Sequence, residues 1–152
     1  MRETTRLREL TVRYTVKRDH RGRPIALGHT LTTPRESAAI LVPLLQHEPS
    51  EVFAILCLST KRRVIAFHEV SRGTLDSTLV APREVFKAAI LANAAAIILA
   101  HVHPSGDPAP SPDDLHLTRQ LTAAGTLLGI EVLDHIIVGD GRYVSFREIG
   151  HL

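Results

Sequence analysis

Hydrophobic residues in this chain fall into two kinds of pattern, uninterrupted apolar runs and stretches that alternate with polar residues. The apolar runs 52–58 and 94–100 predict strands that are buried on both faces of a sheet. Shorter or alternating stretches predict further strands at 10–17, 63–70, 131–138 and 142–146. The turn residues 59–62 and 139–141 are expected to join two pairs of these strands as hairpins.

Helices are predicted in three of the intervals between the strands, and each begins near a proline. Thr33-Pro34-Arg35-Glu36 is a capping box that opens a helix to about Gln46. A second helix begins at Pro82, and its expected buried face is Val85, Phe86, Ala89 and Ile90. The third runs from Pro112 to about Leu128 and is capped by Gly129, with Leu117, Leu121 and Ala124 facing the core. This interleaving predicts an α/β (α+β) domain with a mixed, mainly antiparallel sheet flanked by helices.

Composition supports one globular domain with a substantial core, because the chain has 152 residues, of which 44% are hydrophobic and 22% charged. The single cysteine, Cys57, excludes an intramolecular disulfide and a Cys-rich zinc ribbon, and its apolar surroundings predict a small core residue. The sequence shows no signal peptide, transmembrane stretch or lipidation motif. We therefore expect a cytoplasmic protein without a membrane partner.

Positive charge is concentrated at the N-terminus, although the net charge of the chain is only +2. Residues 1–23 carry a local balance of +5, which leaves about −3 for the remainder. This basic segment could contact nucleic acid, but the interpretation we favour is a solvated strand edge that basic residues protect from edge-to-edge pairing. We assign residues 1–30 to a basic strand and loop of the same domain, and residues 31–152 to its main body.

Two histidines follow the apolar run 94–100 directly and are the strongest indication of function. A His-x-His pair alone means little in a chain with nine histidines, but His101 and His103 are followed by Ser111 and Asp114. Two imidazoles and one carboxylate are donors that zinc accepts, and three protein ligands leave a fourth position open to water. The pattern therefore indicates a catalytic site with one Zn²⁺ per chain, as in a metal-dependent hydrolase.

The second half of this motif also has a purely structural interpretation. Ser111, Pro112 and Asp114 have the spacing of the N-cap, N1 and N3 positions of a helix, which is a capping box. The two interpretations are compatible, because a carboxylate in a first helical turn is held in a defined position.

A hydrolytic zinc site also requires a general base. The chain has neither the H-E-x-x-H of zincins nor the H-x-E with P-C-x-x-C of zinc deaminases. Glu51 is our candidate, because it stands at the start of the buried strand 52–58. Glu48 and Glu69 are alternatives, and any of the three could instead be a solvated surface acid.

Five short strings in the chain are typical of one protein family: Ser71-Arg72-Gly73-Thr74-Leu75, Pro82-Arg83-Glu84-Val85-Phe86-Lys87, His101-Val102-His103-Pro104-Ser105-Gly106, Pro110-Ser111 and Asp134-His135-Ile136-Ile137-Val138. Together they resemble the RadC family, which belongs to the JAB/MPN superfamily of zinc metallopeptidase-like domains. The resemblance extends from about residue 30 to the C-terminus, and it implies a JAB/MPN-like domain with a cytidine-deaminase-like layout.

The resemblance implies that His101, His103 and Asp114 ligate zinc, that Glu51 activates the metal-bound water, and that Ser111 stabilises the tetrahedral intermediate. It thereby implies a JAMM-type metallohydrolase that cleaves peptide or isopeptide bonds in a protein or peptide substrate. Val102 stands where family members usually have asparagine. We expect its side chain to point away from the metal and to leave ligation unaffected.

Other functions remain open at this point. The metal could be a structural or vestigial feature of a protein-interaction module, or the protein could be a DNA-repair accessory that binds nucleic acid through its basic N-terminal segment. His135 is open in the same way, because it could orient a ligand or be a hydrogen-bonded core histidine.

Overall fold

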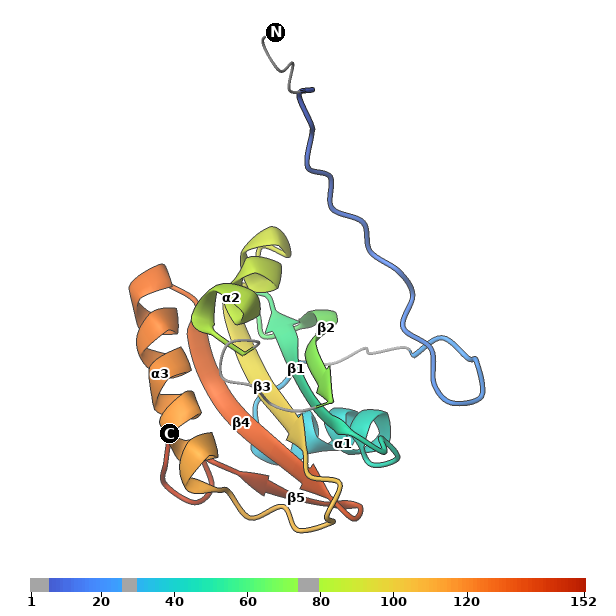
Figure 1. Cartoon of the computed structure of the whole chain (residues 1–152), viewed down its shortest axis with the longest axis vertical. Coiled ribbons are helices and arrows are strands. Elements are labelled where there is room, and N and C mark those ends of the chain that lie inside the picture. The colour runs from blue at the N-terminus through green and yellow to red at the C-terminus, as the bar shows by residue number, and fades with distance from the viewer. Residues whose placement is uncertain (1–5, 26–29, 74–79) are drawn as a thin grey trace, which may run out of the picture.

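The computed structural model describes residues 6–25, 30–73 and 80–152, and its strands form one mixed sheet in the order β2-β1-β3-β4-β5 (Figure 1). Only β3 and β4 are parallel, and the other neighbours are antiparallel. The strands are β1 (Glu51–Leu58), β2 (Val64–Gly73), β3 (Ala96–Val102), β4 (Glu131–Gly139) and β5 (Arg142–Ser145). The helices are α1 (Pro34–Leu45), α2 (Pro82–Leu91) and α3 (Pro112–Leu128).

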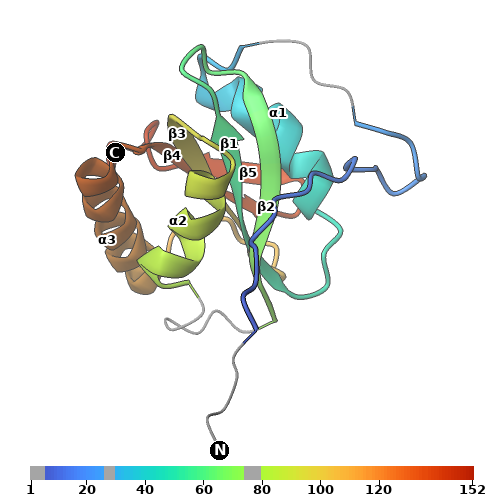
Figure 2. The same cartoon turned by 90° about the horizontal axis from the view of Figure 1, so that it is seen from above.

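The helices divide between the two faces of the sheet, with α1 on one face and α2 and α3 on the other (Figure 2). Strands β2, β3 and β4 run in one direction, and α2 and α3 form the connections from β2 to β3 and from β3 to β4. Both crossovers step the same way across the sheet. Because such crossovers are right-handed, both helices must lie on one face, and α1 covers the other.

The expected fold class is confirmed, with a mixed, mainly antiparallel sheet flanked by helices. Strands β1 and β3 are buried almost throughout, as their uninterrupted apolar runs predict. The capping box at Thr33 forms as predicted, and Gly129 caps α3 in a left-handed conformation. Within the described residues, none of the helices is long and apolar enough to cross a membrane.

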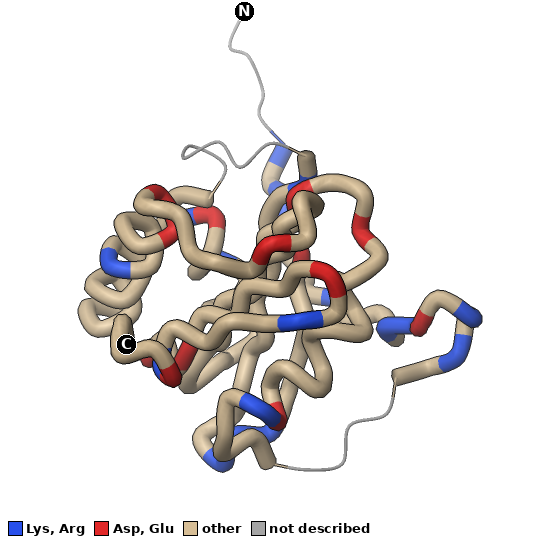
Figure 3. The backbone as a smooth tube through the Cα atoms, turned by 90° about the horizontal axis from the view of Figure 1, so that it is seen from below, with Lys and Arg blue, Asp and Glu red and all other residues tan. Residues whose placement is uncertain are grey.

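The predicted strand at 10–17 is wrong, because these residues run beside the domain in an extended path without a sheet ladder. The alternation of apolar and polar residues showed which face such a strand would bury, but a strand also needs a hydrogen-bonding partner. Tyr14, on the apolar face of the predicted strand, is 61% exposed. The chain next makes an isolated bridge between Arg18 and Pro24, around a basic turn that projects from the domain (Figure 3).

Residues 1–5 and 26–29 of the N-terminal segment, and Thr74 and Leu75 of the family strings, lie outside the described residues.

Two single-residue expectations have opposite outcomes. Cys57 is a fully buried core residue, as its apolar surroundings predict, and burial raises the pKa of its thiol to about 11. Ile90 was expected in the core beside Val85, Phe86 and Ala89, but it is 52% exposed. It follows the buried Ala89 directly, and the rotation of about 100° per residue around the helix axis turns it away from the core.

Gly125 in α3 lies so close to the strand that follows that no side chain fits there. A Cβ atom at this position would lie 2.4 Å from the backbone oxygen of Ile130 and 3.2 Å from Phe86. Gly125→Ala is therefore expected to lower the free energy of unfolding by about 1–3 kcal/mol through overpacking, although alanine is the better helix former. Chemical denaturation would measure this, with Thr126→Ala on the exposed side of α3 as control. Equal or greater stability of Gly125→Ala would contradict this close approach.

Candidate metal centre

The two histidines of the motif lie at the end of β3, on the sheet face that α2 and α3 cover. His101 pairs with Phe53 of β1 and Ile137 of β4, and its side chain is buried beside Phe53. Strand alternation places His103 on the same side as His101 and turns the intervening Val102 into the core under α1. The expectation that Val102 points away from the site is confirmed.

The carboxylate of the site comes from the first turn of α3. Ser111 is the N-cap and Asp114 occupies N3: the Asp114 N–H donates to Ser111 Oγ at 3.1 Å, and the Ser111 N–H donates to Asp114 Oδ2 at 2.8 Å. The capping box predicted for these residues therefore forms. It holds a buried carboxylate at the positive end of a helix dipole, which favours negative charge.

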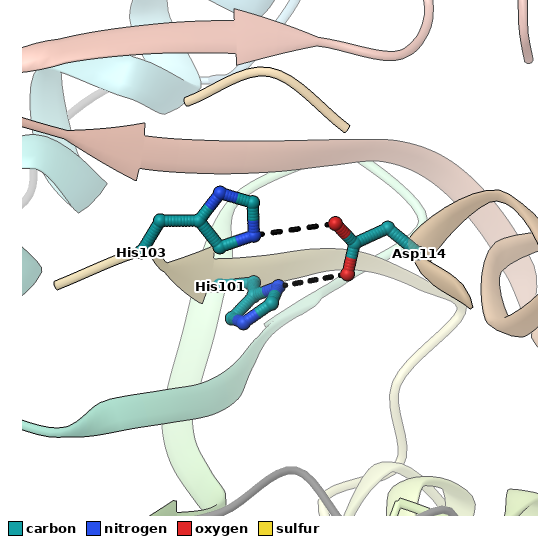
Figure 4. Close-up of side chains that lie close together, drawn as sticks. All are labelled: His101, His103 and Asp114. Carbon is teal, nitrogen blue, oxygen red and sulfur yellow. Dashed lines mark ion pairs between the residues drawn. The ribbon is translucent and has the colours of Figure 1, made fainter. Parts of the chain in front are cut away.

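His101, His103 and Asp114 converge into one cluster (Figure 4). His101 Nδ1 lies 3.3 Å from Asp114 Oδ1, and His103 Nε2 lies 3.2 Å from Asp114 Oδ2. One donor atom from each residue can be chosen so that all three lie within 4.8 Å of one another, a spacing that can hold a metal ion. The cluster therefore offers two imidazole nitrogens and one carboxylate oxygen.

Two features of the imidazoles fit a bound cation. His103 Nδ1 is 2.7 Å from the Asp107 carbonyl oxygen, so the N–H at Nδ1 donates there and the lone pair of Nε2 faces the cluster. Both ring nitrogens of His101 are buried, and neither makes a hydrogen bond with the described part of the chain. His101 Nδ1 faces Asp114 Oδ1 at 3.3 Å without hydrogen-bond geometry, and a metal ion held by both atoms would satisfy the buried ring nitrogen.

The charge state of Asp114 also suits a metal ligand. Burial on its own would raise the pKa of this carboxyl. The neighbouring His101 imidazole and the Ser111 N–H outweigh burial, and they hold the pKa of Asp114 below its usual range. Asp114 is therefore a carboxylate at neutral pH, as ligation requires.

Glu51 lies at the edge of the cluster, where β1 begins beside β3. Its Oε1 is 4.0 Å from His101 Nε2, and its side chain is 37% exposed, so it reaches both the cluster and solvent. The two other acids considered from the sequence are not placed in this way, because Glu48 and Glu69 both form ion pairs with Arg72. The structure thus brings Glu51, rather than Glu48 or Glu69, to the buried histidine.

A cavity of about 760 Å³ opens beside the cluster and shares His103 with it. Its walls come from the segment after α1, the loop after β3 and the β4–β5 turn, including Gln46, Glu48, Asp107 and Arg142. Arg142 donates a hydrogen bond to the Gly106 carbonyl oxygen at 3.2 Å and thereby ties the turn to the loop. Of the cluster residues, His103 lines this cavity, whereas His101 and Asp114 do not.

His135 lies one layer below the cluster and contacts it indirectly. It is fully buried, its ring centroid is 6.3 Å from that of His101, and its Nδ1 is 2.7 Å from Thr118 Oγ1. Its neighbour Asp134 points to the other face and accepts hydrogen bonds from Ser145 Oγ and two backbone N–H groups. Sequence reasoning noted His135 but missed Thr118, whose spacing of one helical turn from Asp114 was the available signal.

The sheet, its helices and the histidine–aspartate cluster together have the layout of a JAB-like domain. A family model described as the RadC-like JAB domain matches residues 31–151, and the chain belongs to this family. The basic segment 1–30 precedes the matched region.

Relatives in bacteria and archaea carry the name UPF0758 protein, which states no activity. The protein of Desulforudis audaxviator is 50% identical over 125 residues, which cover 82% of this chain and 54% of that protein. For Symbiobacterium thermophilum the identity is 52% over 122 residues, 80% of this chain and 52% of the relative. The protein of Methanosarcina acetivorans is 45% identical over 120 residues, which cover 79% of this chain and 52% of that protein. The chain thus spans about half the length of these relatives.

Metal binding at this cluster can be measured directly. Zn²⁺ is expected to bind at one ion per chain, and His103→Ala should lower its affinity at least tenfold, because one of three donors is lost. His116→Ala, an exposed histidine on α3, is the matched control and should bind as the wild type does. Isothermal titration with Zn²⁺ tests this, and an unchanged affinity in His103→Ala would exclude the cluster as the binding site.

The buried His135 should make the stability of the metal-free protein depend on pH. Burial, followed by the nearby His101, lowers the pKa of His135 to about 3, whereas an unfolded histidine titrates near 6.5. Between these pH values the unfolded chain binds more protons than the folded protein. The contribution of neutral His135 to the free energy of unfolding is therefore complete above pH 6.5 and is lost as the pH falls towards 3. Urea unfolding at pH 4.5 and 7 with a chelator present should show a smaller difference for His135→Leu than for wild type. An equal difference in both proteins would contradict a buried neutral His135.

Proposed function

We propose that this protein is a zinc-dependent hydrolase of the JAMM type that cleaves peptide or isopeptide bonds in a protein or peptide substrate. One observation carries the proposal: the buried His101, whose nitrogens lack hydrogen bonds, lies between the carboxylates of Asp114 and Glu51. One carboxylate completes a two-histidine donor set, and the other is a half-exposed acid that can exchange protons.

His101, His103 and Asp114 would hold the ion, because their donor atoms converge and Asp114 is a carboxylate. A bound Zn²⁺ supplies a Lewis acid and lowers the pKa of a coordinated water to about 7. Asp107 keeps the proton of His103 on Nδ1, so that Nε2 stays available as a donor. The capping box at Ser111 keeps the Asp114 carboxylate in place through repeated cycles.

Glu51 takes the role of general base in this proposal. Its carboxylate accepts a proton from the attacking water and returns it to the amine that leaves. Its position supports this role, because the side chain is anchored at the start of β1 and still reaches solvent.

Ser111 stabilises the negative charge that develops on the carbonyl oxygen. Its Oγ accepts the Asp114 N–H, which leaves the hydroxyl hydrogen free to donate towards the site. The cavity that His103 lines has polar walls that suit a peptide backbone. Because the matched region makes up only about half of each relative, the rest of those proteins could contribute to substrate choice in them.

Glu51→Gln separates metal binding from catalysis. The variant should bind Zn²⁺ with wild-type affinity, because Glu51 is not among the three donors, but lose cleavage by about 10²–10⁴-fold. Glu69→Gln, which alters an acid on the exposed part of β2, is the control and should keep full activity. Cleavage of peptide and isopeptide-linked libraries by the zinc-loaded proteins measures both.

Two outcomes would overturn parts of this proposal. Full activity of Glu51→Gln would remove Glu51 as the base. Zinc binding without turnover by the wild type on either library would favour a protein-interaction module that carries a metal site.

A further inference from the structure

A hydrogen bond between α3 and β4 lies directly beneath the candidate metal centre. Thr118 follows Asp114 by one helical turn, so the two side chains project from the same face of α3. Thr118 Oγ1 is 2.7 Å from the Asp114 carbonyl oxygen and 2.7 Å from His135 Nδ1. Both Thr118 and His135 are inaccessible to solvent. This contact therefore connects the turn that carries Asp114 to the sheet.

The proton arrangement of this contact follows from the donors available. The Thr118 hydroxyl has one hydrogen, which it donates to the Asp114 carbonyl oxygen. Its oxygen must then accept the N–H of His135 Nδ1. The lone pair of His135 Nε2 is left without a partner among the described residues. An apolar side chain would fill this place without a buried unpaired nitrogen, so the hydrogen bond to Thr118 is the interaction that accounts for a histidine here.

His135 is a rigid anchor for the helix. Its ring stacks on Phe146 with centroids 4.6 Å apart, and it meets Phe53 edge-on at 5.7 Å. On the neighbouring strand β3, His135 pairs with Leu99. Leu99 precedes His101 by two residues, so both lie on the same face of β3. One end of the hydrogen bond is therefore set by the same strands that position His101, and the other end by the helix that positions Asp114.

We propose that Thr118 and His135 are positioning residues, whose hydrogen bond sets the place of Asp114 relative to His101 and His103 and thereby raises the affinity for Zn²⁺. The proposal rests on the proposed zinc site. It extends that site to two residues outside the three donors, which act through the position of Asp114. Outer partners of this kind commonly change metal affinity by about 10–100-fold when they are removed.

Thr118→Val tests the contact, because valine keeps the shape of threonine and removes the hydroxyl. Zn²⁺ affinity, measured by competition with a chromophoric chelator at a temperature where every variant is folded, should fall at least tenfold. Thr118→Ser, which restores a hydroxyl, should recover most of the affinity. Thr122→Val is the matched control, since Thr122 Oγ1 makes the same intrahelical bond, to the Thr118 carbonyl oxygen at 2.8 Å, but none to a strand within the described part of the chain.

The partner residue gives an independent arm of the test. His135→Leu should lower Zn²⁺ affinity as Thr118→Val does, and His135→Asn, which places an N–H near the position of Nδ1, should recover part of it. Because one hydrogen bond is shared, the double variant Thr118→Val/His135→Leu should lose no more affinity than either single variant. Multiplied losses in the double variant, or equal losses in Thr122→Val and Thr118→Val, would overturn the proposal.

A second measurement keeps this inference separate from the proposed function. In metal-free protein, amide hydrogen exchange at Ser111 and Asp114 should be faster in Thr118→Val than in Thr122→Val, relative to amides of β3. If the wild type bound no Zn²⁺ but this difference appeared, the proposed function would fail and the positioning of Asp114 would stand. Unchanged exchange together with unchanged Zn²⁺ affinity in Thr118→Val would disprove the positioning role.

Discussion

The reciprocal hydrogen bonds between Ser111 and Asp114 begin α3 and build the candidate metal centre in the same step. Asp114 Oδ2 accepts the N–H that the helix leaves unpaired and also faces His103, while Oδ1 faces His101. A helix that began one residue earlier or later would turn this carboxylate by about 100° around the helix axis, away from both imidazoles. The start of α3 is therefore a condition for the whole cluster.

The sheet meets this condition through the hand of its crossovers. Because β3, α3 and β4 form a right-handed unit, the start of α3 returns over the end of β3, on the face where His101 and His103 project. Antiparallel β1 enters the sheet at the same end and brings Glu51 beside His101. The start of β1, the end of β3 and the start of α3 thus place their polar residues at one edge by topology, while the apolar interiors of the strands form the core.

Much of this arrangement follows from local sequence signals. The uninterrupted apolar runs identified β1 and β3, and the prolines and caps placed the helix starts within a residue or two. His101, His103 and Asp114 could be grouped because they are close in sequence and flank one loop. Glu51 required knowledge of which strands are neighbours, and residue spacing alone left Glu48 and Glu69 as alternatives.

The wrong strand at 10–17 and the missed Thr118 have one physical cause, because both depend on contacts between separate elements. Alternation at 10–17 described a surface with one apolar side, but pairing depends on a partner strand that no local pattern specifies. Thr118 escaped notice because a threonine inside a helix is common, and its meaning comes only from His135 on the strand that follows. Interactions across elements were the part that the sequence could not supply.

The burial of Cys57 has a consequence for the chemistry of the whole domain. With a pKa of about 11, this thiol is ionised to only about one part in ten thousand at pH 7, and its sulfur is enclosed by the core. The donor cluster consists of nitrogen and oxygen atoms alone. Thiol-modifying reagents therefore find no accessible sulfur in the folded core, and the donor cluster contains no thiol that oxidation could convert.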